Sequence, residues 1–175
     1  MLFRSDELGL KSVINFLTTA EIEADGPDRL PSGLTETRLS MEAGNMASLT
    51  AVVNEARSTG DFSAVSPEIN PDIHRRLIVE GREYYAALLK KLSEPGNLPM
   101  VFHCSHGVHR TGTATAILLS ALGVPWETIR EDYLLSNKYR QSEIGPRLEQ
   151  LKRQYAAGMG IDVADVDAAN MEAFY

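Results

Sequence analysis

LPMVFHCSHGVHRTG (residues 98–112) is the stretch of the sequence that says most about the fold. Its first seven residues form a nearly continuous apolar run, which predicts a central strand covered on both faces. A short loop follows with the only cysteine of the sequence, Cys104, and a helix is expected to begin near Arg110 or Thr111. Ligands of open α/β sheets bind outside the carboxyl ends of strands, where helix N-termini also offer unpaired N–H groups. We therefore expect a binding site at this loop.

Cys104 and Arg110 bring complementary chemistry to the loop. A thiol at a helix N-terminus, ringed by backbone N–H groups, has its pKa lowered from about 8.5 into a range of roughly 3.5–7.5. Arg110 adds a permanent charge and a planar fork that matches two phosphate oxygens. Gly107 lets the backbone turn so that its amides converge, and Gly112 permits close helix packing. The pattern favours a nucleophile that binds phosphate.

The rest of the chain alternates strands and helices early and gathers helices late. Short apolar or alternating runs predict strands at 11–17, 35–41 and 98–104. Helical spacing predicts helices at 45–57, 70–92, 111–122, 125–135, around 148–155 and at 163–174. This order predicts an α/β fold with a small, mostly parallel central sheet flanked by helices. We expect one domain over 1–175, in which 43–69, rich in Ser, Gly, Asn and Pro, forms a lid insertion that adds only its short helix to the core.

Charge and composition exclude several classes of protein. The chain has 175 residues, a formal charge of −7 and a pI near 5.1, which argue against nucleic-acid binding and against an anionic membrane surface. Acidic residues lie in the first ten positions, where a signal peptide would need an apolar core. No apolar run approaches the roughly 18 residues of a membrane span. A single cysteine cannot form an internal disulfide, so we expect a reducing, cytoplasmic location.

The loop resembles a known phosphate-binding motif. Residues 103–112 are similar to the HCxxGxxR(T/S) loop of the cysteine-dependent protein tyrosine phosphatase superfamily, and the matching positions are Cys104, Gly107, Arg110 and Thr111. The segments LFRS (2–5), GLKSVINFL (9–17) and EDYLLSN (131–137) look like its branch of bacterial-type and fungal tyrosine phosphatases, which is related to the dual-specificity phosphatases. The resemblance covers most of the chain in order and implies the phosphotyrosine protein phosphatase II fold.

The resemblance also implies a reaction. Phosphomonoesters, above all protein phosphotyrosine, would be hydrolysed through a phosphocysteine on Cys104, with His103 helping to keep the thiolate ionised. The Arg110 fork would hold the phosphoryl oxygens, and the Thr111 hydroxyl would ease the departure of the sulfur. The other substrate-binding positions would be Ser105, His106, Gly107, Val108 and His109. The implied partners are a phosphorylated protein or a small phosphomonoester, with inhibition by phosphate or vanadate and without any metal or other cofactor.

One pair of residues departs from the branch. Lys-Asp usually precedes the arginine, whereas this chain has Val108 and His109. Loss of the lysine removes a cation that would favour inositol-lipid substrates, so phosphotyrosine is better supported than phosphoinositide. His109 either grips phosphate, assists proton transfer with its ordinary pKa near 6.5, or faces solvent as a plain loop residue.

The general acid that protonates the leaving group has several candidates. Asp72 lies 32 residues before Cys104 (104 − 72), a spacing similar to that of dual-specificity relatives. In the alternative interpretation, Asn70 caps a helix and Asp72 only complements its dipole. Glu42 lies where the bacterial and fungal branch would place a carboxylate; Asp61 and Asp25 are weaker candidates.

Three other functions remain open at this point. His103, Cys104, His106 and His109 supply enough ligands for a metal site, although zinc sites usually draw on two separated pairs. Stoichiometric zinc in the purified protein would favour that interpretation. A phosphoinositide or broad dual-specificity phosphatase would differ in substrate range. A catalytically inactive phosphotyrosine-binding module would bind phosphate esters without turnover.

Overall fold

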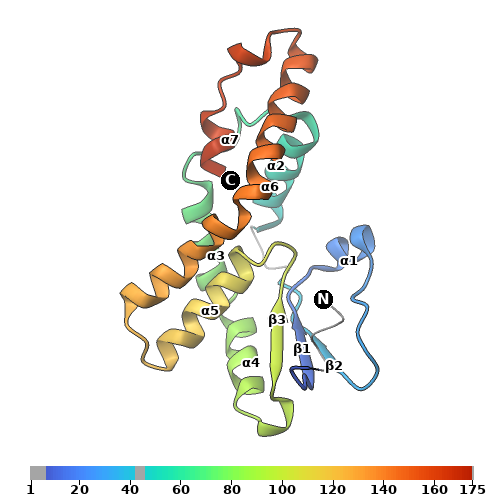
Figure 1. Ribbon diagram of the computed structural model, residues 1–175, viewed down its shortest axis with the longest axis vertical. Helices are drawn as coiled ribbons and strands as arrows, with labels where there is room; N and C mark the ends of the chain where they lie inside the picture. The colour runs from blue at the N-terminus through green and yellow to red at the C-terminus, as the bar shows by residue number, and fades with distance from the viewer. Residues whose placement is uncertain (1–6, 42–45, 175) are drawn as a thin grey trace. The chain divides into compact units, whose positions relative to one another are not determined.

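The computed structural model describes residues 7–41 and 46–174 (Figure 1). Within them the chain divides into two compact units. The first holds residues 7–41 and 77–133, and the second holds residues 46–76 and 134–174. The loop around Cys104 belongs to the first unit.

A three-stranded parallel sheet forms the centre of the first unit. Its strands are β1 (Ser12–Asn15), β2 (Thr35–Arg38) and β3 (Met100–His103), in the order β2-β1-β3. Both pairings are parallel, and Ile14 of β1 lies opposite Thr37 and Phe102. The small parallel sheet and the three predicted strand positions are confirmed.

The prediction that β3 is a central strand covered on both faces is wrong. Within the described residues β3 pairs only with β1, and Val101 is 36% exposed. The central strand is β1, whose four residues are all buried. An apolar run carries no information about how many strands pair with a strand, and in β3 it also overstates how far the strand is covered, because none of its four residues is buried.

Among the described helices, three lie wholly within this first unit. They are α1 (Thr19–Asp25), α4 (Arg82–Leu92) and α5 (His109–Ala121). Helices α4 and α5 lie beside β3 in Figure 1, and a 3₁₀ turn at Pro95–Asn97 leads from α4 to β3. Under the sheet, the ring of Phe16 packs against Tyr85 and Phe102, with centroid distances of 6.4 and 6.2 Å. These ring contacts pack α4 and β3 against Phe16, the residue that follows β1.

The predicted helix over 70–92 is in fact two helices. Helix α3 (Ile69–Glu80) ends just before Gly81, and α4 begins just after it. A Cβ atom at Gly81 would lie 2.3 Å from the carbonyl oxygen of Leu77, so the chain can turn closely there only because glycine lacks that atom. The 3.6-residue spacing of apolar residues continues across Gly81 from one helix into the next. The sequence pattern therefore does not reveal the break between the two helices.

The second unit is helical in its described part. It contains α2 (Met46–Thr59), α3 as far as Arg76, the later part of α6 (Trp126–Met159), a 3₁₀ turn at Val163–Asp165 and α7 (Ala169–Phe174). Sequence spacing predicts two helices over 125–155, but α6 is continuous through Pro146. Gly145 precedes that proline and has no Cβ to meet the proline ring, which lets the helix continue at the cost of one hydrogen bond.

Contacts between α7 and earlier segments hold this unit together. Phe62 packs on Phe174 at a centroid distance of 5.8 Å, and the Arg57 guanidinium lies 5.2 Å from the same ring. The Asn70 side chain donates to the carbonyl oxygens of Ala173 and Phe174 at 3.1 and 3.0 Å. Asn70 therefore lies inside α3 and ties it to the C-terminal helix, so its predicted role as a helix cap is wrong.

Among the described helices, none combines the length and the apolar character that crossing a bilayer requires.

Candidate active site

Cys104 lies directly after the last residue of β3, at the base of the loop. It is buried, with 9% of its surface exposed, and the Thr111 hydroxyl donates to its sulfur over 3.1 Å. Gly107 adopts a φ of 71°, the left-handed conformation that glycine tolerates best. Helix α5 begins two residues later, at His109, and the Thr111 hydroxyl that contacts the sulfur belongs to the first turn of this helix. The sequence places a thiol, a turn and a helix start at one point.

Arg110 is bound on one side by the protein itself. Its Nη1 donates to the Phe16 carbonyl oxygen at 2.8 Å and to Glu21 Oε2 at 2.7 Å, while Nη2 donates to Glu21 Oε1 at 2.5 Å. A guanidinium carries five N–H donors, and these contacts use three of them. The other two, on Nε and Nη2, share one edge of the plane. That edge has the geometry that grips two oxygens of a phosphate.

Charge reinforces this arrangement. Burial would lower the pKa of Arg110, but the hydrogen bond and the charge of Glu21, followed by the charge of Cys104, raise it. Burial would likewise raise the pKa of Glu21, but hydrogen bonds from Arg110 and Thr18 outweigh it and hold that pKa below its ordinary value. Both partners are therefore ionised at neutral pH.

Glu21 also belongs to the start of α1. It forms a capping box with Thr18, because the Glu21 N–H donates to the Thr18 hydroxyl at 3.2 Å and the Thr18 N–H donates to Glu21 Oε2 at 2.9 Å. Sequence reasoning missed both α1 and Glu21. The signal was present as Thr18-Thr19-Ala20-Glu21, the T-x-x-E pattern of a capping box, although nothing local connects it to Arg110.

On the sheet side of the cysteine, His103 contacts a second carboxylate that sequence reasoning missed. His103 Nε2 lies 2.7 Å from Asp28 Oδ2, and the side-chain amide of Asn15 donates to the same oxygen at 3.1 Å. Asn15 is fully buried at the end of β1. The residue before the thiol is thus held by polar groups from β1 and from the loop that precedes β2.

Comparison with known proteins agrees with this geometry. A model of the family described as "Tyrosine phosphatase family" matches residues 3–175. The chain belongs to the tyrosine phosphatase family.

Two relatives have names that agree with the family. Over 60 residues the chain is 40% identical to a Cupriavidus necator protein named as a tyrosine-protein phosphatase, a match that covers 34% of this chain and 21% of the relative. Over 147 residues it is 26% identical to the triple specificity protein phosphatase PtpB of Mycobacterium tuberculosis, which covers 74% of this chain and 53% of that protein. The matched part is therefore about half of PtpB and about a fifth of the other relative.

In this tyrosine phosphatase family chain the remaining loop residues are more exposed. Ser105 and His106 are exposed, and the Ser105 hydroxyl lies 3.0 Å from His106 Nδ1. Val108 and His109 are half-buried, and His109 is the first residue of α5.

Two of the candidate acids of this tyrosine phosphatase family member, Asp72 and Asp61, belong to the second unit. Asp72 belongs to the second unit, in the first turn of α3, and accepts from Arg75 Nη1 at 2.6 Å. Asp61 accepts from the Ser63 N–H at 2.9 Å, and this bond holds the pKa of Asp61 below its ordinary value, which makes it a poor proton donor. Glu42 lies outside the described residues.

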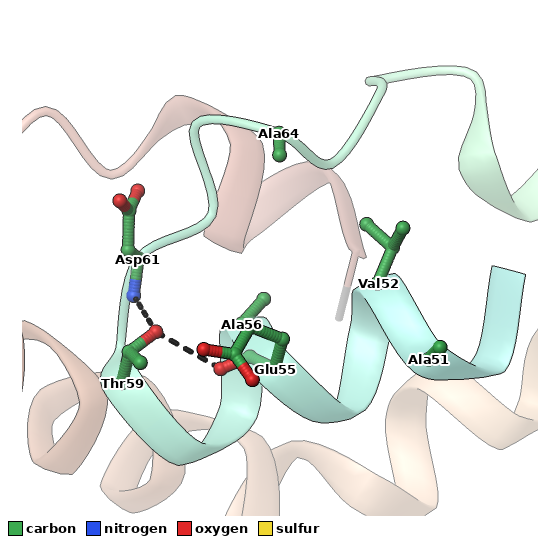
Figure 2. A pocket seen from close by; sticks show the side chains of 7 residues that line it. All are labelled: Ala51, Val52, Glu55, Ala56, Thr59, Asp61 and Ala64. Carbon is green, nitrogen blue, oxygen red and sulfur yellow. Dashed lines mark hydrogen bonds between the residues drawn. The ribbon is translucent and has the colours of Figure 1, made fainter. Parts of the chain in front are cut away.

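Other parts of the described chain do not offer a comparable site. None of its groups of three or more His, Cys, Asp or Glu side chains is arranged to hold a metal ion. An open hollow in the second unit is lined mainly by small residues, together with the carboxylates of Glu55 and Asp61 (Figure 2). Its lining includes no basic side chain, so it does not suit a phosphate.

Proposed function

We propose that this chain is a cysteine-dependent phosphatase that hydrolyses phosphomonoesters, with protein phosphotyrosine as its substrate. The observation that carries the proposal is the pair of contacts around the loop. Thr111 donates to the Cys104 sulfur, and Glu21 with Phe16 fixes Arg110 so that one two-donor edge stays available. Family membership supports the same chemistry.

The first step forms a bond between sulfur and phosphorus. The Cys104 thiolate attacks the phosphorus atom, the bond from phosphorus to the leaving oxygen breaks, and that oxygen takes a proton from a carboxylic acid. Negative charge on the equatorial oxygens is held by the Arg110 edge and by the backbone N–H groups of 105–110. We propose Ser105, His106, Gly107, Val108 and His109 as the residues around the bound phosphate, and Asp72 as the acid.

The second step releases phosphate. Water attacks phosphorus, the sulfur–phosphorus bond breaks, and the Thr111 hydroxyl stabilises the returning thiolate through its 3.1 Å contact. The proton of the water passes to the carboxylate that gave up its proton in the first step, so the cycle closes without an added reactant.

Substrate preference follows from the loop. Val108 and His109 stand where the family branch usually has a lysine and an aspartate, and the loss of the lysine removes a cation that would favour inositol phosphates, so phosphotyrosine is the preferred class. PtpB is named a triple specificity protein phosphatase, which makes a comparison of substrate classes the natural assay. Initial rates should be measured with p-nitrophenyl phosphate, a phosphotyrosine peptide, a phosphoserine peptide and a soluble inositol phosphate.

The test of the proposal compares wild type with Cys104→Ser and Thr111→Ala. We expect wild type to hydrolyse p-nitrophenyl phosphate with inhibition by vanadate, Cys104→Ser to be inactive, and Thr111→Ala to accumulate phosphoenzyme. Turnover that survives in Cys104→Ser would contradict the proposal, as would a folded wild type that binds vanadate without any turnover.

A further inference from the structure

A polar network on the sheet side of Cys104 joins His103, Asp28 and Asn15. His103 lies between Asp28 and the backbone, with Nε2 at 2.7 Å from Asp28 Oδ2 and Nδ1 at 3.4 Å from the carbonyl oxygen of Cys104. His103 and Asp28 are both partly buried, with 27% and 24% of their side chains exposed. The contact joins residues 75 positions apart in the chain.

Both ring nitrogens of His103 face acceptors. A carboxylate oxygen and a carbonyl oxygen each accept hydrogen bonds and cannot donate them. A neutral imidazole carries one N–H and could satisfy only one of these contacts, whereas the imidazolium satisfies both. The geometry therefore suits a positively charged His103 next to the thiol-bearing residue.

Asn15 fixes the carboxylate that makes this possible. Its side-chain amide donates to Asp28 Oδ2 at 3.1 Å and to Glu36 Oε1 at 3.0 Å, and its oxygen accepts from the Leu17 N–H at 2.8 Å. Asn15 is fully buried, so its side chain has one defined orientation. Asp28 is thus aimed at His103 from a rigid support at the end of β1.

The neighbouring charges do not replace Asp28. Glu36 contacts Asn15 and lies 3.4 Å from Arg38 Nε, so its charge has a cation of its own on β2. Glu21 is engaged with Arg110. Phe16, directly after β1, connects the contacts of His103 with those of Arg110. Its N–H donates to the His103 carbonyl oxygen at 3.0 Å, and its own carbonyl oxygen accepts a hydrogen bond from Arg110 Nη1.

We propose that Asp28 is a positioning residue that holds His103 as an imidazolium against the Cys104 main chain and thereby makes the Cys104 thiol more acidic. The inference rests on the proposed function in that it treats Cys104 as the thiolate nucleophile. A positive charge beside a cysteine stabilises the thiolate relative to the thiol. Asp28 acts on the sulfur only through His103.

The experiment measures the rate of Cys104 alkylation by iodoacetate against pH, which requires no turnover. Asp28→Asn keeps the shape of the side chain and an acceptor for Asn15 but removes the charge. Glu23→Gln, an exposed carboxylate on α1, is the matched control for loss of one negative charge. His103→Asn and the double variant Asp28→Asn/His103→Asn complete a cycle. Thermal unfolding of each variant verifies the fold.

We expect the pH midpoint of alkylation to rise by about one unit in Asp28→Asn, so that alkylation near pH 6 slows about tenfold. Glu23→Gln should react like wild type. His103→Asn should show a rise of similar size, and the double variant should rise no further. A wild-type midpoint in folded Asp28→Asn would overturn the inference, as would an additional rise in the double variant beyond His103→Asn.

This readout separates the inference from the proposed function. If wild type fails to hydrolyse phosphate esters while the alkylation midpoints move as expected, the proposed phosphatase activity is wrong and the link from Asp28 to Cys104 stands. If wild type is active but the Asp28→Asn midpoint stays in place, the phosphatase proposal stands and the role of Asp28 is wrong.

Discussion

At the scale of single residues, Arg110 joins the fold to the proposed chemistry. Arg110 contacts Phe16 and Glu21, which precede it by 94 and 89 positions in the chain. The motif around Cys104 predicts the presence and role of Arg110, because the spacing within the loop is local. It does not predict Glu21 or Asp28, because a contact across many residues leaves no periodic or motif signal in a single sequence.

The first prediction concerns the charge and shape of Arg110. Arg110→Lys keeps a positive charge but loses the planar fork, and with it the contacts to Glu21 and the two-donor edge. We expect kcat for p-nitrophenyl phosphate to fall by about 10²–10³-fold, with a small change in unfolding midpoint. Near-normal turnover in this variant would contradict the phosphate-binding role.

The second prediction concerns Glu21 and its matched control Glu23. Glu21→Gln frees one side of the Arg110 guanidinium, so we expect kcat/KM to fall about tenfold and vanadate to bind more weakly. Glu23→Gln, two residues away and exposed, should match wild type. Equal behaviour of the two variants would show that Arg110 needs no support from α1.

The pKa of Glu21 gives the third prediction, for stability against pH. Because its pKa in the folded chain is below the ordinary value of 4.5, the ion pair with Arg110 contributes its full stability above that value. The contribution is lost as the pH falls through the folded pKa. Unfolding midpoints measured from about pH 7 down to about pH 3 should therefore drop less steeply in Glu21→Gln than in wild type. Parallel curves would contradict this assignment.

The fourth prediction tests the acid. If Asp72 protonates the leaving group, Asp72→Asn should lose the basic limb of the pH–rate profile and spare substrates with a good leaving group. Glu42→Gln provides the comparison, because the sequence offers Glu42 as the alternative. An unchanged profile in Asp72→Asn together with a lost limb in Glu42→Gln would transfer the role to Glu42.

At the scale of elements, the sequence pattern predicts those helices and strands that are long enough or apolar enough to show a period. It predicts β1, β2, β3, α2 and α5 in place. It misses α1, which has seven residues and buries none of them. It also misses the break at Gly81 and the continuity of α6 through Pro146, because both depend on close packing and local backbone geometry, which apolar spacing does not record.

The fifth prediction belongs to the end of α2. Gly60 has a φ of 79°, and a Cβ there would lie 2.8 Å from the Leu151 carbonyl oxygen and 2.9 Å from the Tyr155 nitrogen. Gly60→Ala should therefore destabilise the second unit by about 2 kcal/mol. Gly158→Ala, in α6 with open space around it, should be neutral or stabilising by up to about 1 kcal/mol. Urea unfolding of both variants measures the difference, and equal midpoints would contradict the close contact.

At the scale of the whole molecule, the sequence predicts one domain with a lid, and the described residues form two compact units. The expectation that 43–69 adds only its short helix to the core is wrong, because Phe62 and Val65, beyond α2, are also buried, at 3% and 1% exposure. Single buried apolar residues such as these are hard to recognise in a segment that is otherwise rich in Ser, Gly and Asn. We propose that this segment acts as a lid that remains anchored through these two side chains.

The central claim is that the Cys104 sulfur carries the phosphoryl group during turnover. The most direct measurement is to quench wild type during hydrolysis of p-nitrophenyl phosphate and to locate the phosphoryl group by peptide mass spectrometry. The account predicts a phosphorylated Cys104 that disappears in Cys104→Ser and accumulates in Thr111→Ala. Turnover without any phosphorylated Cys104, or with the phosphoryl group on another residue, would contradict it.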